Sequence, residues 1–457
     1  MSDEPLKRVI ESPAIALEKT IDTSRELTDR LTNNAPVKKV SKYWKMLGPG
    51  LTTGAADDDP AGITTYSQAG ARYGYQLLWL STLTFPLMAI VQEMCARIGL
   101  VTGRGLAANI RMYFPRWVLY TSTLLLFGAN TLNLGADLGA MAKAGQLLNP
   151  SLNFGLLVLG FALVSLLLQI FTAYEKYASY LKWLALVLLS YVFTTLSIKN
   201  LDWSTIVQYT FIPYVNLSLD QVYLVCAVLG TTISPYLFFW QTSQEIEEEI
   251  QEGRTSLKLR QEETTNEEIK SMRVDVWSGM FLSNLVMYFI ILACAVTLNA
   301  NGITNITTAS DAAQALRPLV GEGAYLLFTL GIIGTGMLAV PVLAGSASYA
   351  LSESLGWKNG LYRKLKDAYA FYGVLIIAML IGFGLNFVGI DPIQALIFSA
   401  VLNGLIAPVI LVCILLISSD KKVMGNRVNG AITSSLGWFI TIVMTVAGLL
   451  TIYSYFM

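Results

Sequence analysis

Apolar residues recur along the chain in long windows that are separated by short polar turns. Each window, with its flanks, approaches the ~20 residues that a helix needs to cross a bilayer. With these flanks included, the predicted membrane spans lie at about 46–71, 76–100, 117–145, 153–172, 180–199, 222–248, 272–299, 323–351, 368–388, 392–416 and 432–456. This pattern predicts an all-α integral membrane protein with about eleven transmembrane helices.

The start of the chain departs from this pattern. It is charged throughout and has no apolar stretch beside a small-residue cleavage site, so it does not resemble a secretory signal. We expect a cytoplasmic N-terminal tail at 1–42 and a transmembrane transporter domain at 43–457. With the N-terminus inside, four of the 31 Lys and Arg fall on the outer side: Arg72, Lys143, Lys199 and Arg317. This asymmetry predicts a multi-pass protein of the plasma or inner membrane with a cytoplasmic N-terminus and an extracytoplasmic C-terminus.

Two of the predicted helices are interrupted by polar residues and a proline. The first contains Asp57-Asp58-Asp59-Pro60-Ala61-Gly62, and the sixth contains Gly230-Thr231-Thr232-Ile233-Ser234-Pro235. An odd set of five helices followed by five more enters the membrane from opposite sides, which is the arrangement of an inverted repeat. We expect repeat one at about 46–199, repeat two at about 222–416 and an extra helix at about 432–456. Matched interruptions of this kind indicate a binding site at the membrane midplane.

Composition excludes several functional classes. The chain is 54% apolar and 14% charged, has zero formal net charge and carries no dense basic block, so we expect a lipid bilayer around it and no nucleic-acid partner. It contains no His, its four Cys are isolated within predicted spans, and it has no phosphate-binding loop. These features predict a protein that is not an enzyme, has no resident cofactor and shows no obligatory protein partner.

The first interruption places a carboxylate deep in the bilayer. Asp59 lies 15 residues after Trp44, which corresponds to about 20 Å of helical rise. Asp59 is a possible cap for the helix that Pro60 begins, but capping alone does not explain this depth. Because Pro60 lacks an N–H, it releases backbone carbonyls from Ala56 onward. A carboxylate beside free carbonyls predicts a cation site.

The neighbours of Asp59 suggest how such an ion is held. Ala61 and Gly62 are small enough to leave room for the ion's water. Asp57 and Asp58 point away from Asp59 around the helix, and we take one of them, Asp58, as a candidate for lining the permeation path.

The second interruption adds neutral oxygen donors. Pro235 releases carbonyls near Thr231 and Thr232, whose hydroxyls, with that of Ser234, are further candidate ligands. The alternative for these hydroxyls is hydrogen bonding to the preceding helical turn. Asn403 in the tenth span is another candidate ligand. An all-oxygen set suits Mg²⁺, Ca²⁺ or Mn²⁺ rather than softer metals.

The stretch from Glu245 to Lys270 is rich in charges of both signs. We expect a solvated cytoplasmic loop that continues the sixth helix. A cytoplasmic ion-sensing patch is the alternative interpretation.

Several motifs together resemble the Nramp divalent-metal transporters across all the predicted spans. They are Gly48-Pro49-Gly50, Asp59-Pro60-Ala61-Gly62, Gly70-Ala71-Arg72-Tyr73-Gly74-Tyr75, Leu77-Leu78-Trp79 and Ala96-Arg97-Ile98-Gly99-Leu100-Val101-Thr102-Gly103-Arg104. The resemblance implies a LeuT-type fold of eleven or twelve helices. It also implies a metal site made by Asp-Pro-Gly-Asn in helix one and Ala-x-x-Met-Pro-His in helix six.

The chain departs from this family pattern at the site itself. Asp59 keeps the metal-binding carboxylate. The replaced positions are Ala61 for the Gly, Gly62 for the Asn, Thr231 for the Ala, Ser234 for the Met and Tyr236 for the His. On helix three Asp137 keeps an acidic residue, while Ala140 stands where the proton-relay Glu is expected, and helix nine contains no Arg.

These departures resemble the Nramp-related magnesium transporters, which carry a hydrated ion without proton symport. The resemblance implies a Mg²⁺ importer that also takes Mn²⁺, works by alternating access and is driven by the ion gradient and the membrane potential. The first alternative is a proton-coupled symporter for Mn²⁺ and other divalent transition metals. More distant alternatives are an amino-acid symporter and a non-transporting metal sensor on the same fold.

Overall fold

The computed structural model describes residues 48–172, 189–198, 201–214, 216, 218–306, 309–313, 321–454 and 456. The expected N-terminal tail at 1–42, Trp44 and much of the predicted fifth helix at 180–199 lie outside these residues. Contacts divide the chain after Gly48, so the unit Pro49–Met457 is described by itself.

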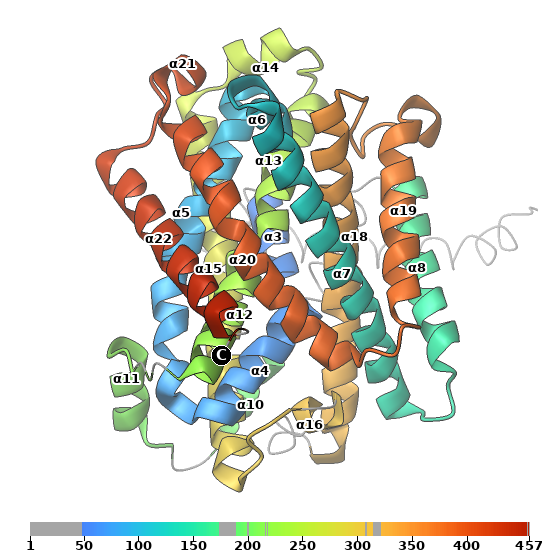
Figure 1. Cartoon of the computed structure of the whole chain (residues 1–457), viewed down its shortest axis with the longest axis vertical. Helices are drawn as coiled ribbons and strands as arrows, with labels where there is room; N and C mark the ends of the chain where they lie inside the picture. The colour runs from blue at the N-terminus through green and yellow to red at the C-terminus, as the bar shows by residue number, and fades with distance from the viewer. Residues whose placement is uncertain are drawn as a thin grey trace, which may run out of the picture. The chain divides into compact units, whose positions relative to one another are not determined.

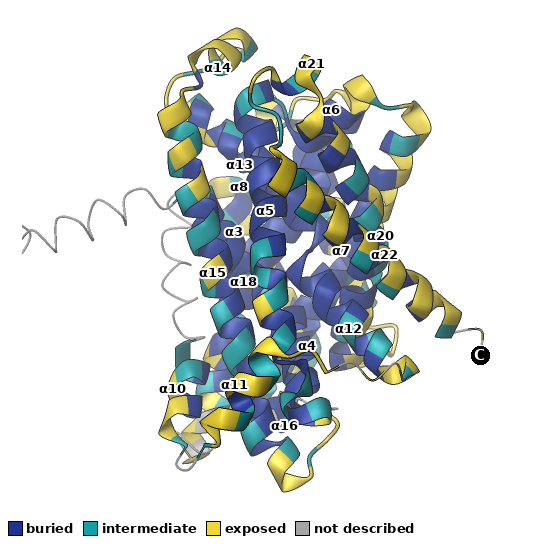
Figure 2. Ribbon diagram, turned by 90° about the vertical axis from the view of Figure 1, so that its left-hand side faces the viewer, coloured by how far each residue is buried: buried dark blue, intermediate teal, exposed yellow. Residues whose placement is uncertain are grey.

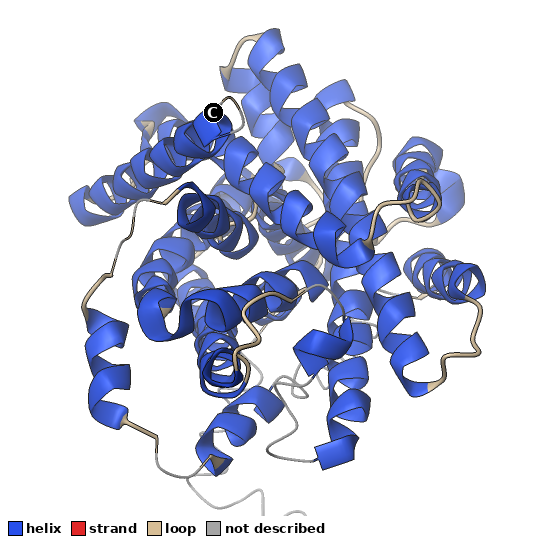
Figure 3. Ribbon diagram, turned by 60° about the horizontal axis from the view of Figure 1, so that its bottom comes forward, coloured by secondary structure: helices blue, strands red, loops and turns tan. Residues whose placement is uncertain are grey.

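Helices and short turns make up the part of the chain that the structure describes, with no β-strand in it (Figure 3). Helices satisfy every interior backbone hydrogen bond within one segment, which apolar surroundings demand. The long unbroken helices are α5 (Trp79–Thr102), α7 (Arg116–Leu148), α8 (Phe154–Phe171), α15 (Asn266–Thr297), α18 (Ala324–Leu355), α19 (Tyr369–Leu385), α20 (Pro392–Ser419) and α22 (Ala431–Ser454). The prediction of an all-α fold is confirmed.

Seven helical segments among the described residues are long and apolar enough to cross a membrane. They are α5, α8, the α12–α13 segment, α15, α18, α20 and α22. The other predicted spans correspond to the broken first helix, to α7 with its polar centre, to α10 (Leu189–Ser197) and to the shorter α19.

Both predicted interruptions are real breaks. The first separates α3 (Pro49–Asp57) from α4 (Pro60–Tyr73), and the second separates α12 (Leu219–Thr232) from α13 (Pro235–Gln251). In each case a polar residue with an extended backbone precedes the new helix, and proline occupies the first helical position; Asp59 caps α4 with its side chain, whereas Ser234 makes no such cap for α13. Proline ends the incoming helix because its ring cannot donate the next hydrogen bond.

The broken helices occupy the centre of the bundle. In Figure 1, α3 and α4 pack against α15, α12 packs against α20, and α13 packs against α5 and α18. In the most apolar windows of α5 and α12–α13, 83% of residues are buried, against 22% in α8 and 33% in α22. The exposed apolar faces of α8 and α22 therefore lie on the rim, where lipid would cover them. The two helices stand at opposite edges of the bundle in Figure 1, and Figure 2 shows the exposed residues along α22.

Glycines allow the central helices to approach closely. A Cβ at Gly54 of α3 would lie 2.3 Å from the Gly279 carbonyl oxygen of α15. A Cβ at Gly230 of α12 would lie 2.1 Å from the Ala400 oxygen of α20. Both contacts exclude any larger residue, since real Cβ atoms do not approach so near.

Short helices not predicted from the hydrophobic pattern connect the long ones. They are α6 (Leu106–Tyr113), α11 (Trp203–Phe211), α14 (Leu257–Glu263), α16 (Ala309–Ala313) and α21 (Lys421–Met424). The expectation of a solvated loop from Glu245 onward is wrong for its first part. Glu245, Glu247 and Glu249 lie on α13 and are 2–4% exposed, because α13 continues as a packed helix to Gln251.

Candidate functional site

The two helix breaks lie against each other. The Tyr66 hydroxyl of α4 is 3.2 Å from Thr232 Oγ1 at the end of α12. A Cβ placed on Gly62 would lie 3.4 Å from Thr231 Oγ1. The structure therefore brings the interruption of the first repeat into direct contact with that of the second.

Asp59 lies at the centre of this contact and is 1% exposed. Its Oδ1 accepts the Gly62 N–H at 2.7 Å, which is the N-cap of α4. Its Oδ2 accepts the Asn133 amide of α7 at 3.0 Å and the Tyr236 hydroxyl of α13 at 3.3 Å. Asn133 is held in turn by the Ser399 hydroxyl of α20 at 2.7 Å. Two helices far away in sequence, α7 and α13, thus contact one carboxylate, and α20 reaches it through Asn133.

Two backbone carbonyls are released by the prolines. The helical partner of a carbonyl is the N–H four residues later, and for Ala56 and Thr231 that residue is a proline. The Ala56 oxygen accepts the Tyr236 hydroxyl at 3.1 Å instead. The Thr231 oxygen accepts the Ser234 hydroxyl at 2.7 Å. Both carbonyls are therefore available to a ligand that displaces one hydroxyl.

The hydroxyls of the second break bond largely to their own helix. Ser234 Oγ also lies 2.7 Å from the Gly230 oxygen, and Thr232 Oγ1 donates to the Val228 oxygen at 2.7 Å. This is the local hydrogen bonding that was the alternative to a ligand role. The hydroxyl oxygens keep lone pairs, so both remain possible acceptors for a coordinated water.

Asp57 and Asp58 face a different helix from Asp59. Both are buried, and the Ser283 hydroxyl of α15 lies 2.8 Å from Asp57 Oδ2 and 3.3 Å from Asp58 Oδ1. A hydroxyl has one proton, so Ser283 satisfies one carboxylate at a time. The three adjacent aspartates are therefore divided between two sides of the break.

Two further polar side chains near the breaks have unsatisfied atoms. Asp137 of α7, one turn after Asn133, faces the Ala61 amide without a hydrogen bond of normal geometry. Asn403 of α20 is 1% exposed, and its Oδ1 has no partner among the described residues. Gly404, its neighbour, lies against Gly230 of α12, so Asn403 sits beside the second break.

Sequence reasoning missed several partners of the site. Asn133 donates a hydrogen bond to Asp59, and Ser399 donates one to Asn133. Neither residue belongs to a broken helix. Met287 of α15 also reaches the second break, with its Sδ 3.8 Å from Thr232 Oγ1. For Asn133 a signal exists, because it lies four residues before the acidic Asp137 and therefore on the same face of the helix.

The arrangement around Asp59 offers oxygen atoms that a cation could bind. Within the described residues, no group of three or more His, Cys, Asp or Glu is placed to hold a metal ion. One carboxylate instead stands among carbonyl, hydroxyl and amide groups, which are ligands that hard cations accept.

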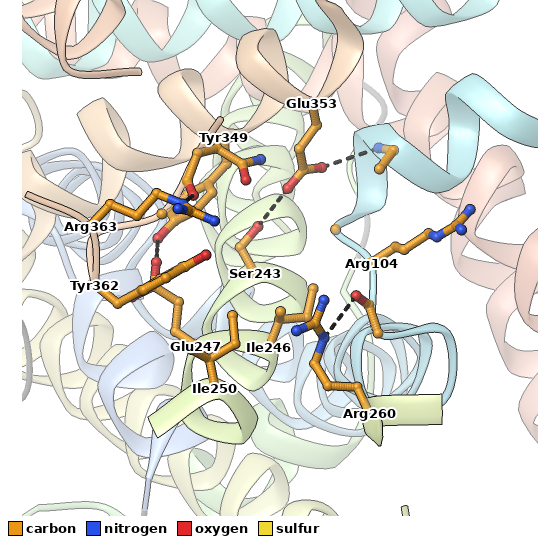
Figure 4. Close-up of a pocket in the computed structure, with 15 residues that line it drawn as sticks. Arg104, Ser243, Ile246, Glu247, Ile250, Arg260, Tyr349, Glu353, Tyr362 and Arg363 are labelled. Atoms are coloured by element: carbon orange, nitrogen blue, oxygen red, sulfur yellow. Dashed lines mark hydrogen bonds between the residues drawn. The ribbon is translucent and has the colours of Figure 1, made fainter. Parts of the chain in front are cut away.

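A separate pocket of about 230 Å³ lies where α13 and α18 end (Figure 4). The Glu353 carboxylate of α18 accepts the Ala108 N–H of α6 at 3.1 Å and the Ser243 hydroxyl of α13 at 3.3 Å. The Tyr349 hydroxyl of α18 donates to Glu247 of α13. These contacts tie the end of α13 to α18 and α6 on one side of the bundle.

Relatives with known names share nearly the whole chain. The divalent metal cation transporter MntH of Deinococcus radiodurans is 26% identical over 421 residues, covering 91% of each chain. The protein of the same name from Klebsiella pneumoniae is 25% identical over 414 residues, covering 90% of this chain and 94% of the relative.

Solved structures show the same fold. The Eremococcus coleocola manganese transporter superposes with a TM-score of 0.73 at 18% identity, over 90% of this chain and 87% of the other. Mhp1, a nucleobase-cation-symport-1 family transporter, gives a TM-score of 0.53 at 12% identity, over 89% and 90%. The expected LeuT-type architecture is confirmed. The family description "Natural resistance-associated macrophage protein-like" matches residues 50–454, and the chain therefore belongs to the Nramp family.

Proposed function

We propose that this protein is a divalent metal cation transporter that imports Mg²⁺, and also Mn²⁺, across the cell membrane by alternating access without proton coupling. The observation that carries the proposal is the buried Asp59 carboxylate held between two touching helix breaks. The lysine and arginine distribution supports a cytoplasmic N-terminus. The names of the relatives support a metal-ion substrate.

The proposed ligands are oxygens. Asp59 supplies the charge, the Ala56 and Thr231 carbonyls supply hard neutral donors, and Thr232, Ser234, Asn403 and Asp58 are candidate contacts to coordinated water. Histidine is absent from the chain, and no thioether is among the hydrogen-bond partners of Asp59. Mg²⁺ suits such a site because it binds through few carboxylates and keeps several waters.

Small residues at the first break support a hydrated ion. A Cβ on Gly62 would already lie 3.1 Å from the backbone carbonyl oxygen of Asp57 and 3.4 Å from Thr231 Oγ1. A larger residue would crowd these two oxygens, whereas Gly62, with Ala61 beside it, places no side chain between them. Discrimination against softer metals is correspondingly weak, which agrees with the inclusion of Mn²⁺.

The absence of proton coupling is inferred from α7 and α19. Ala140 is buried and cannot carry a proton, and the sequence of α19 contains no Arg. Membrane potential alone is a sufficient driving force. A dication gains about 4.6 kcal/mol per 100 mV of inside-negative potential, equivalent to about a thousandfold accumulation.

The test is uptake of Mg²⁺ and of Mn²⁺ into liposomes that contain the purified protein, with a set inside-negative potential. The proposal predicts Mg²⁺ uptake above that of protein-free liposomes, and slower but measurable Mn²⁺ uptake is compatible with it. Mn²⁺ uptake without any Mg²⁺ uptake would contradict the magnesium assignment.

The second candidate is proton-coupled Mn²⁺ transport. Asp137 favours it, since this carboxylate of α7 is buried and neither of its oxygens has a hydrogen-bond partner among the described residues. A pH reporter inside the same liposomes separates the two. Acidification that depends on the metal would support the symporter and contradict uncoupled import.

A further inference from the structure

The Tyr236 hydroxyl binds the same two oxygens that the proposed function gives to the ion. It lies 3.1 Å from the Ala56 carbonyl oxygen and 3.3 Å from Asp59 Oδ2. The phenol reaches these atoms from α13, across the contact between the two breaks. A cation and this hydroxyl therefore compete for the same lone pairs.

Tyr236 is the weakest of the three donors to Asp59. The Gly62 N–H is closer, at 2.7 Å, and is fixed as the cap of α4. The Asn133 amide is also closer, at 3.0 Å, and is held by Ser399. The Tyr236 hydroxyl has one proton for two acceptors, so each hydrogen bond is only partly formed. It is the donor that an arriving ion displaces most easily.

The rest of Tyr236 is firmly placed. It directly follows Pro235 at the start of α13, is 1% exposed, and its carbonyl accepts the Ser346 hydroxyl of α18 at 2.8 Å. Packing fixes the position of a buried phenol ring, and its O–H usually makes a hydrogen bond. Loss of the hydroxyl alone therefore changes the competition without moving the helix.

We propose that Tyr236 is a specificity-determining residue whose hydroxyl substitutes for the ion's water at Ala56 and Asp59. This inference rests on the proposed function and deepens it. A water bound to Mg²⁺ donates to the same two acceptors as the phenol does, so exchange of one for the other costs little. A bare ion must instead compete with the hydroxyl for the lone pairs. Tyr236 thus lowers the affinity of Asp59 and the Ala56 carbonyl for a directly coordinated ion, and it favours rapid release of a hydrated ion.

The test compares Tyr236→Phe with wild type in the liposome assay, measuring KM and kcat for Mg²⁺ separately. The variant lacks the hydroxyl that competes with the ion for these oxygens, and loss of one such hydrogen bond is expected to lower KM about fivefold. kcat should fall as well, because the ion is released more slowly. The concentration of Mg²⁺ that half-maximally raises the melting temperature of the purified protein should fall by a similar factor.

Tyr372→Phe is the matched control. Tyr372 is also 1% exposed, and its hydroxyl donates to a backbone carbonyl, that of Arg363, at 2.7 Å, away from the breaks. Its KM should equal that of wild type. An unchanged or raised KM in Tyr236→Phe would overturn the inference and leave Tyr236 a structural contact. If the proposed function fails, wild type itself shows no Mg²⁺ flux. The KM values of wild type and Tyr236→Phe are then compared with Mn²⁺ as the transported ion.

Discussion

At the scale of single residues, we assign Asp59 two roles that are usually separate, a helix cap and the proposed cation ligand. Its Oδ1 caps α4, as aspartate before proline does in many helices, while Oδ2 faces Asn133 and Tyr236. A cap needs only a hydrogen-bond acceptor, whereas a cation site needs the negative charge. The two roles are therefore separable by mutation.

Asp59→Asn should reduce Mg²⁺ flux at least a hundredfold while the protein stays folded, because the amide oxygen still accepts the Gly62 N–H but the charge is lost. Uptake and size-exclusion chromatography measure the two effects. Asp391→Asn is the control, since Asp391 caps α20 in the same way before Pro392 and is exposed. Equal flux losses in both variants would show that Asp59 acts only as a cap.

Local sequence predicts the parts of this site that follow from chain connectivity. Ala56 and Thr231 are identifiable because a proline four residues later removes the partner of each carbonyl. Asn133, Ser399 and the hydroxyl contact of Tyr236 are not, because they depend on which helices meet in space. Sequence alone does not decide whether the Ser234 hydroxyl bonds to its own helix or to a ligand, since a hydroxyl serves either role.

At the scale of elements, the hydrophobic pattern located the long helices to within several residues, and the prolines located both breaks. It did not predict short connecting helices such as α6 and α14, whose residues are not apolar enough to stand out. It also misjudged the end of α13, where Glu247 is buried because Tyr349 and its neighbours enclose it. Burial of a charged residue depends on neighbours that are distant in sequence.

Close packing of α3 on α15 is a second element-level feature, and Gly54 tests it. Gly54→Ala should lower stability by about 1–3 kcal/mol, because the new Cβ would clash with the Gly279 carbonyl and separate the two helices. Thermal unfolding followed by size-exclusion chromatography measures the loss. Gly160→Ala in α8 is the control, since a Cβ there meets no atom within 4 Å. A Gly54→Ala protein as stable as Gly160→Ala would contradict this packing.

At the scale of the whole molecule, alternating access requires the two repeats to move around the breaks. Contacts of Glu353 with α6 and α13 hold one end of the bundle together. Under the proposed mechanism, we expect these contacts to open when the site faces that side. The direction of net flux is then set by the ion gradient and the potential, and by protons only if a coupled group such as Asp137 takes part.

The most direct test of uncoupled import is the membrane potential at which net Mg²⁺ flux in liposomes becomes zero. For a dication moving alone, each tenfold excess of Mg²⁺ inside is balanced by about 30 mV of inside-negative potential. Uncoupled import predicts this value, unchanged when a pH gradient is imposed. A balance point that moves with the pH gradient, or one near the ~20 mV per tenfold excess expected when one proton accompanies each ion, would contradict it.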